Sequence, residues 1–197
     1  MLRRMHMQRG VSLIELMVGL AIMGLLLGLG VPGFRTFLQN SQIRNAAEAI
    51  QNGLSLAKIE AVKRNTSIHF VLGTGTAWTV CTSASTTCPA ADVIQARPQS
   101  EGAKNAVLAV SEVVASTNAA ATSPAFTTTL TFNGLGRVTT IPAGNNAVFN
   151  ISNTTGGDCV TAGGEMRCLR VVVTSAGQVR MCDPARPVTT PPDPQAC

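Results

Sequence analysis

The N-terminal part of the sequence contains one uninterrupted apolar segment. Residues 11–31 read VSLIELMVGLAIMGLLLGLGV and contain a single charged side chain, Glu15. As an α-helix, a segment of this length spans roughly 30 Å, the thickness of a bilayer's hydrocarbon core. Arg3, Arg4 and Arg9 precede the segment without an acidic residue. This charge distribution predicts a cytoplasmic N-terminus, one crossing of the inner membrane and a periplasmic C-terminal region.

A cleaved secretory signal is the alternative to a membrane anchor. Such signals have an apolar region of roughly 7–15 residues, followed by a cleavage site of small residues. The apolar segment here is longer, and Val31-Pro32-Gly33-Phe34 offers no site of that kind. We therefore expect residues 11–31 to remain as an anchor.

All six cysteines follow the apolar segment, on the side predicted to be oxidising. An even number of cysteines in an exported region is typical of disulfides, and pairing of neighbours would close three short loops. Other connectivities remain open. The sequence has no Cys-x-x-Cys, and His69 is the one histidine after the apolar segment, so we expect neither a metal nor another cofactor. The expected disulfide cysteines are Cys81, Cys88, Cys159, Cys168, Cys182 and Cys197.

Glu15 is energetically unfavourable in an otherwise apolar segment. A carboxylate inside a membrane helix costs on the order of 2.5–3.5 kcal/mol, and such residues usually have a partner. One interpretation places Glu15 near the cytoplasmic interface, within reach of water. The other gives it a cationic partner, so that pairing offsets the desolvation of both charges.

The segment Arg9-Gly10-Val11-Ser12-Leu13-Ile14-Glu15-Leu16 resembles the cleavage signal of type IV prepilins and pseudopilins. The resemblance implies that residues 1–10 are a leader, and that a prepilin peptidase cuts between Gly10 and Val11 and methylates the Val11 amine. It also implies that Glu15 pairs with this amine on a neighbouring subunit, and that Pro32 kinks the helix. One departure is Val11, where the family usually has Phe or Met.

Residues 32–65 have the pattern of an amphipathic helix. Apolar residues recur at intervals of four and three, which places them on one helical face. We expect this face to pack on the protein's own domain, with a partner helix as the alternative. Glu60 and Arg64 have the spacing of a helical ion pair, and the helix is expected to end near Arg64 and Asn65. The apolar positions are Ile43, Ala47, Ile50, Leu54, Ala57 and Ala61.

Residues 66–197 are predicted to form a β-rich periplasmic domain. The last two predicted strands form a hairpin, residues 115–124 are expected to be a mobile loop, and the proline-rich residues 183–197 cannot form regular structure. A disulfide through Cys197, most simply to Cys182, would hold this tail. The predicted strands are residues 67–72, 77–81, 106–114, 128–132, 147–151, 169–174 and 178–182.

Three stretches of this second half resemble the GspH/FimT branch of type IV pilin-like proteins. They are LAKIEAVKRN at residues 56–65, FNGLGRV at residues 132–138, and LRVVVT at residues 169–174 with the following GQVR. The resemblance implies an α+β fold, in which a long N-terminal helix packs on a small sandwich-like β domain. It leaves residues 81–127 without a match.

The resemblance implies a minor type IV pilin, a structural component of a priming or tip complex in pilus assembly. Its partners would be other minor and major pilins, or pseudopilins, and the prepilin peptidase. A GspH-like pseudopilin of type II secretion and a FimT-like DNA-binding pilin are the alternatives, and the long disulfide-bearing tail favours a pilin. Because no catalytic triad or metal-binding set is visible in the sequence, we do not expect an enzyme.

The DNA hypothesis depends on positive charge. Removal of the leader would lower the formal net charge from +5 to +2, which is a small surplus for binding phosphates. Arg167, Arg170 and Arg180 are candidate DNA contacts, with a solvated hairpin face as the alternative. DNA-binding FimT members carry Gly-Arg-x-Arg in the last hairpin. Here the stretch is Gly177-Gln178-Val179-Arg180, which favours a structural role.

Overall fold

The computed structural model describes residues 11–83, 87–101, 103–122, 128–187, 189 and 193–197. The predicted leader, Gly10 included, lies outside these residues. The chain divides after Phe37 into two compact parts, and a single helix, α1 (Leu13–Arg64), contributes to both. Each part is described by itself below.

The first part is the N-terminal portion of α1. The large apolar side chains between Val11 and Leu29 are all more than half exposed, because nothing within this part covers them. Among the described residues, α1 is the one helix long and apolar enough to cross a membrane. Pro32 lies within α1, and the kink expected there stays a prediction. The first part is thus an apolar helical rod suited to a membrane or to packing against other helices.

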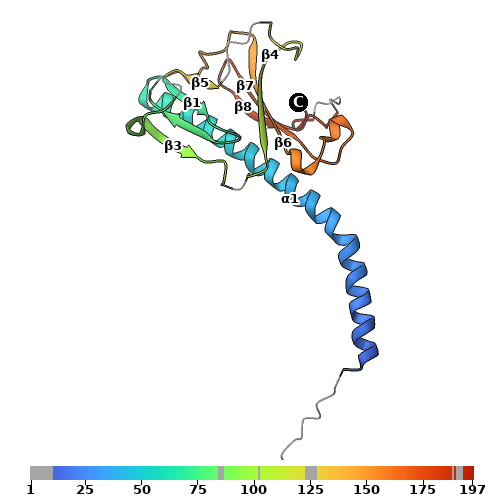
Figure 1. Ribbon diagram of the computed structural model, residues 1–197. Coiled ribbons are helices and arrows are strands. Elements are labelled where there is room, and N and C mark those ends of the chain that lie inside the picture. The colour runs from blue at the N-terminus through green and yellow to red at the C-terminus, as the bar shows by residue number, and fades with distance from the viewer. Residues whose placement is uncertain (1–10, 84–86, 102, 123–127, 188, 190–192) are drawn as a thin grey trace, which may run out of the picture. The chain divides into compact units, whose positions relative to one another are not determined.

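The second part is a domain of two four-stranded antiparallel sheets, packed on residues 38–64 of α1 (Figure 1). Sheet A has the order β3-β2-β1-β5, and sheet B has the order β4-β6-β7-β8. Sheet A contains β1 (Ile68–Leu72), β2 (Trp78–Cys81), β3 (Val93–Arg97) and β5 (Thr129–Phe132). Sheet B contains β4 (Val107–Val114), β6 (Asn145–Ser152), β7 (Leu169–Thr174) and β8 (Val179–Cys182). Short 3-10 helices occupy Ala90–Asp92, Thr154–Gly156 and Val160–Ala162. The predicted α+β pilin-like fold is confirmed.

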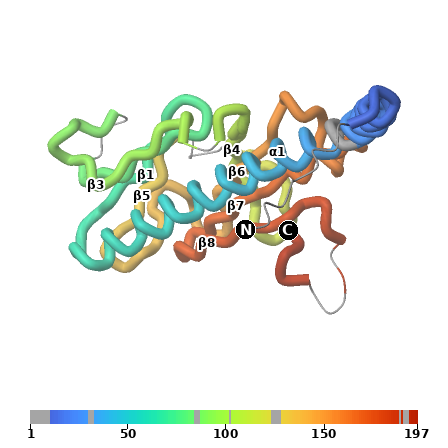
Figure 2. The backbone as a smooth tube through the Cα atoms, turned by 90° about the horizontal axis from the view of Figure 1, so that it is seen from below, coloured from blue at the N-terminus to red at the C-terminus, as the bar shows by residue number. Residues whose placement is uncertain are grey.

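Both sheets share one core with α1, which crosses their strands in Figure 2. All six residues of the predicted apolar face are fully buried, so the expectation that this face packs on the protein's own domain is confirmed. The ring of Phe70 in sheet A meets the ring of Phe149 in sheet B edge-on, with 6.2 Å between centroids. The ring of Trp78 lies 5.7 Å from that of Phe70. The helix and the Phe70–Phe149 contact therefore join the sheets into one domain, and the Phe70–Trp78 contact lies within sheet A.

The C-terminal end of α1 is fixed by local hydrogen bonds. Glu60 accepts from Arg64 Nε at 2.6 Å and from Lys63 Nζ at 3.1 Å. These bonds, that of Arg64 first, hold the pKa of the Glu60 carboxyl below its ordinary value. Asn65 then adopts a positive φ of 50°, which ends the helix, as the sequence predicts.

Two segments differ from the sequence-based expectation. Strand β3 was not expected, because its alternation is weak and no residue in it is fully buried. It pairs with β2 at the edge of sheet A. Residues 115–122, expected to be a loop, turn back along β4, where the Ala121 amide donates to the Glu112 carbonyl at 2.9 Å. The remainder of that predicted loop includes residues outside the described ranges.

Candidate functional site

The first turn of α1 carries the carboxylate on which the assembly hypothesis depends. Glu15 is exposed, and it is the one acidic residue between Val11 and Glu48. Leu16 N donates to Ser12 O at 3.1 Å, so helical hydrogen bonding begins one residue after Val11. A carboxylate in this position is favoured by the positive end of the helix dipole. The positive end of the dipole disfavours a cation at the same place. A cationic amine at Val11 would therefore depend on a carboxylate partner.

The three candidate DNA-contacting arginines are not equivalent. Arg167 Nη1 donates to Asp183 Oδ2 at 3.0 Å, and the Arg167 amide donates to Asn40 Oδ1 at 2.8 Å. Arg167 therefore connects the start of β7 with the C-terminal tail and with α1. Its guanidinium is already paired with a carboxylate, which reduces its attraction for a phosphate.

Arg170 and Arg180 lie on the same face of the β7–β8 hairpin. Arg170 is opposite Cys182, and Arg180 is opposite Val172. Arg170 Nε donates to Asn150 Oδ1 at 2.8 Å, and burial lowers the pKa of its guanidinium. Arg180 is exposed, and the described residues provide its guanidinium with no hydrogen bond or ion pair. Of the three candidates, Arg180 is therefore the one available to an external anion.

The structure contains three disulfides, which join the cysteines as neighbours in the sequence. They are Cys81–Cys88, Cys159–Cys168 and Cys182–Cys197. The expectation that the cysteines form disulfides is confirmed.

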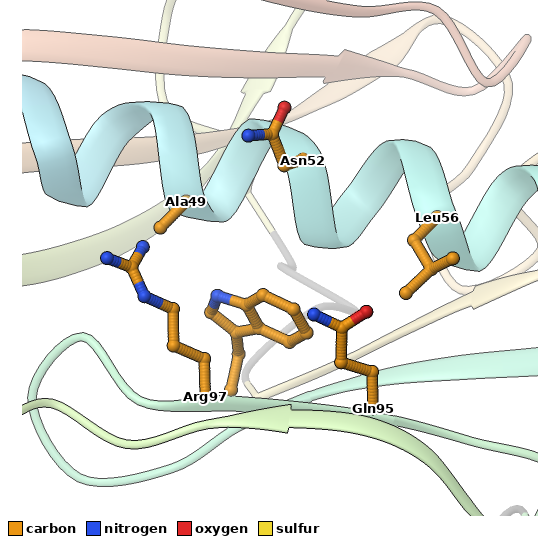
Figure 3. A pocket seen from close by; sticks show the side chains of 6 residues that line it. Ala49, Asn52, Leu56, Gln95 and Arg97 are labelled. Carbon is orange, nitrogen blue, oxygen red and sulfur yellow. The ribbon is translucent and has the colours of Figure 1, made fainter. Parts of the chain in front are cut away.

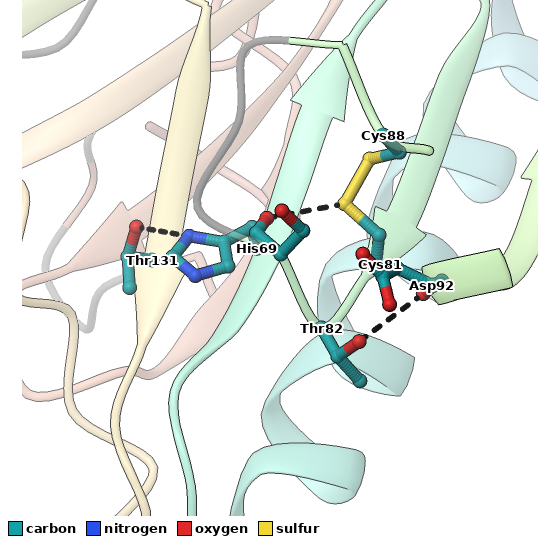
Figure 4. The surroundings of a disulfide bond; sticks show 7 residues. His69, Cys81, Thr82, Cys88, Asp92 and Thr131 are labelled. Atoms are coloured by element: carbon teal, nitrogen blue, oxygen red, sulfur yellow. Dashed lines mark hydrogen bonds between the residues drawn. A yellow bond between two sulfur atoms is a disulfide. The ribbon is translucent and has the colours of Figure 1, made fainter. Parts of the chain in front are cut away.

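The Cys81–Cys88 disulfide fastens the end of β2 to the loop that leads to β3. On the neighbouring strand, His69 Nδ1 lies 2.9 Å from Thr131 Oγ1 (Figure 4). Burial lowers the pKa of His69. The hydrogen bond to Thr131 accounts for this histidine as a structural residue of a buried strand.

The C-terminal tail is fastened to sheet B by a disulfide, and an ion pair joins two of the tail's own residues. Cys197 packs against Val148 and Val172 on the face of sheet B that points away from the main core. Arg186 Nη1 donates to Asp193 Oδ2 at 3.0 Å within the tail. The described part of the tail contains no regular strand or helix, as predicted.

The sequence analysis missed the groups that partner the arginines. Asp183, Asn150 and Asn40 come from the tail, β6 and α1. Asp183 directly follows the predicted hairpin, and this adjacency was the available signal. Asn40 lies 127 residues from Arg167, and no local pattern marks that contact.

A pocket of about 200 Å³ lies between α1 and the β2–β3 edge of sheet A (Figure 3). The guanidinium of Arg97 is engaged, since its Nη2 donates to the Glu101 carbonyl at 2.7 Å and its Nη1 to the Asn45 carbonyl at 3.4 Å. Trp78 Nε1 is buried and has no acceptor among the described residues. The lining includes no carboxylate, histidine or cysteine, so it offers no acid–base or nucleophilic pair. The lining residues are Ala49, Asn52, Leu56, Trp78, Gln95 and Arg97.

The comparisons with known proteins agree with the two-part architecture. The model of the prokaryotic N-terminal methylation motif matches residues 5–31. The model of the type II transport protein GspH matches residues 46–177, which is more than half of the chain. The search of curated proteins gave no match.

Solved structures with a similar fold include a minor pilin and a minor pseudopilin. The type IV minor pilin FimU of Pseudomonas aeruginosa is 20% identical, and the alignment covers 82% of this chain and 98% of FimU with a TM-score of 0.48. The minor pseudopilin EpsH from the type 2 secretion system of Vibrio cholerae is 13% identical, with 74% and 99% covered and a TM-score of 0.46. The two family matches, one on the N-terminal helix and one on the domain, establish that the chain belongs to the GspH/FimT family of type IV pilin-like proteins.

Proposed function

We propose that this protein is a minor pilin that is inserted in the inner membrane and then joins the priming or tip complex of a type IV pilus. The observation that carries the proposal is the combination of a methylation motif on an apolar, uncovered helix with a GspH-type domain on the same chain. The protein's role is then structural. Its first part would contact other subunits, and its second part would be displayed outside the membrane.

The proposed processing follows from the N-terminal motif. A prepilin peptidase would remove residues 1–10 by cutting after Gly10, and it would methylate the new amine of Val11. The mature chain then consists of an apolar helix over residues 11–31, an amphipathic helix over residues 32–65, and a β-rich domain over residues 66–197. A kink at Pro32 would adjust the direction of the helix between its two halves.

In this proposal Glu15 acts during assembly. Its carboxylate would meet the cationic Val11 amine of an adjacent subunit in an environment from which water is largely excluded. An unpaired buried charge costs several kcal/mol, so this pairing favours one axial register between helices over others. The same carboxylate contributes little to the folding of the second part, from which it is separated along α1.

The test is the variant Glu15→Ala, with Glu48→Ala as the matched control. Glu48 is an exposed glutamate on the same helix, within the second part. We expect both variants to reach the membrane in normal amounts, and Glu15→Ala alone to be depleted from sheared pili. Incorporation of Glu15→Ala at the level of the unaltered protein would refute the pairing role.

A minor pseudopilin of a type II secretion system is the second candidate, because the matching family model describes a type II transport protein. The long tail with its Cys182–Cys197 disulfide favours the pilus. Co-purification of the full chain from membranes distinguishes the two machines. We expect pilins, and recovery of secretion pseudopilins alone would assign the protein to the other machine.

A further inference from the structure

An apolar surface lies at the C-terminal end of α1. Its centre consists of Ile59, Val62 and Leu135, whose side chains are 60%, 51% and 80% exposed. Ile59 and Val62 are one helical turn apart, and therefore neighbours on the outer face of α1. Single exposed apolar residues are ordinary, whereas adjacent ones of this size mark interaction sites. We call these three residues the helix-end patch.

The turn that carries Leu135 lies against the helix. A Cβ on Gly136 would be 3.2 Å from Val62 Cγ2, and a Cβ on Gly134 would be 3.0 Å from the Asn65 carbonyl carbon. Leu135 stands between these two contact points, and so it extends the apolar surface of α1 across residues 133–137. The helix-end patch therefore combines residues from two segments that are distant in the sequence and meet at the end of α1.

This turn is held in shape by hydrogen bonds that leave Leu135 exposed. Asn133 Oδ1 accepts from the amides of Leu135 at 3.1 Å and Arg137 at 3.0 Å. The Asn133 and Arg137 backbones are joined by a bond of 2.9 Å, and Gly136 has a φ of 73°, which a glycine adopts without strain. A leucine on a turn fixed in this way keeps its exposed position, so little further ordering is needed when a partner binds.

The border of the patch is basic. The charged residues of the last two turns of α1 and of the 133–137 turn are Lys58, Lys63, Arg64, Arg137 and a single acid, Glu60. Glu60 is 8% exposed and is bonded to Lys63 and Arg64. The exposed charge around the apolar centre is consequently positive. A complementary partner needs an apolar contact surface bordered by carboxylates.

We propose that the helix-end patch is the docking site for the globular domain of a neighbouring pilin subunit that presents an apolar surface bordered by Asp or Glu. This inference rests on the proposed function, which supplies the neighbouring subunit. A two-fold contact between two copies of this chain would place basic borders against each other, and the repulsion disfavours it. The three apolar side chains would provide the centre of the interface, and the basic border its orientation.

The experiment places the photo-cross-linking residue p-benzoylphenylalanine at position 135 of the full chain, in cells that assemble pili. The expected product joins this chain to another protein with a methylation-motif N-terminus, through a peptide of its globular domain that contains carboxylates. Mass spectrometry identifies both ends. The matched control carries the probe at Val107, which is exposed on an edge strand of sheet B and is expected to give no such product.

Charge variants test the basic border with the probe still at position 135. We expect Arg137→Glu to lower the yield of the product several-fold and Arg137→Lys to preserve it. In isolated membranes, added salt should also lower the yield, because exposed ion pairs are screened. A product with lipid, nucleic acid or a second copy of this chain alone would overturn the proposal, as would a yield no higher than at position 107.

The cross-linking experiment can refute the docking site without refuting the proposed function. If Val11 is methylated and the protein enters pili, but position 135 gives no pilin product, only the docking site is refuted. If Val11 is not processed and the chain never leaves the membrane for a pilus, the proposed function itself fails.

Discussion

The guanidinium of Arg167 donates a 3.0 Å hydrogen bond to the Asp183 carboxylate, joining the start of β7 to the first residue after β8. Asp183 is 6% exposed, so its charge is largely withdrawn from solvent, whereas more than half of the Arg167 side chain remains accessible. The pair fixes the first residue of a tail without regular structure, whose other end is held by the Cys182–Cys197 disulfide. It also shows that arginines close together in sequence can have unequal capacity to bind an anion.

The Cys182–Cys197 disulfide is expected to stabilise the domain through the tail. Replacing both cysteines by serine removes a loop closure with a sequence separation of 15, worth about 3 kcal/mol on the chain-entropy model. We expect a smaller loss, because Arg167 still holds Asp183, whose amide donates to the Gln195 carbonyl near the end of the tail. Denaturant unfolding of the full chain in detergent measures it. Non-reducing peptide mapping of the unaltered protein checks the pairing, and a Cys159–Cys182 peptide would contradict it.

Gly53 is expected to be required for packing α1 on sheet A. A Cβ at this position would lie 2.8 Å from Phe70 Cε2 and 2.9 Å from Trp78 Cε2. Overpacking costs about 1–3 kcal/mol, and the better helix propensity of alanine returns about 1 kcal/mol. Gly53→Ala should therefore lower the free energy of unfolding by up to about 2 kcal/mol. Gly33→Ala, at a helical glycine with nothing within 4 Å, is the control and should not lower it.

The predictable elements of the fold are those in which apolar residues recur at a regular spacing along the sequence. The apolar period of the second half of α1 and the short apolar strands bounded by turn residues are visible in short windows of sequence, because burial imposes them. Strand β3 lacks this signal, since it lies at a sheet edge and has no fully buried side chain. The patch around Leu135 was equally invisible, because a turn and a helix end meet there only in the folded chain.

The candidate site residues also divide into those marked by a local sequence motif and those whose surroundings form only in the folded chain. The Glu15 motif is contiguous, so the sequence alone identifies it. The states of Arg167 and Arg170 depend on Asp183 and Asn150, which reach them through tertiary structure. A count of arginines in the C-terminal region therefore does not say how much of their charge is available for DNA.

Processing is expected to depend on Gly10. A peptidase that approaches the backbone closely needs a residue without a side chain, so Gly10→Val should leave an uncleaved precursor, seen as a larger band on immunoblots. Mass spectrometry of the unaltered protein should find a methylated Val11 at the N-terminus. An intact Met1 in protein recovered from pili would contradict this prediction.

The last prediction concerns DNA, for which Arg180 is the one exposed candidate free of a described partner. A single available arginine predicts weak, non-specific duplex binding by the full chain in detergent, with a Kd of roughly 10⁻⁴–10⁻⁶ M. Gln178 directly precedes β8, and its carbonyl accepts from the Thr174 amide, which continues the pairing of the hairpin. It therefore lies on the same face as Arg180, two residues along. Gln178→Arg should therefore add one phosphate contact, raise the affinity and steepen the dependence of log K on log salt by about one unit.

Arg167→Ala is the matched control for this series, because the Arg167 guanidinium is already paired with Asp183. We expect it to change DNA affinity less than Arg180→Ala does, although it weakens the attachment of the tail. The measurement is a salt-titrated binding series on the unaltered chain and the three variants. Tight binding by the unaltered chain that Arg180→Ala abolishes would replace the structural role with that of a DNA receptor. Such a result would assign the binding to Arg180, because Arg167 is paired with Asp183 and Arg170 is half-buried.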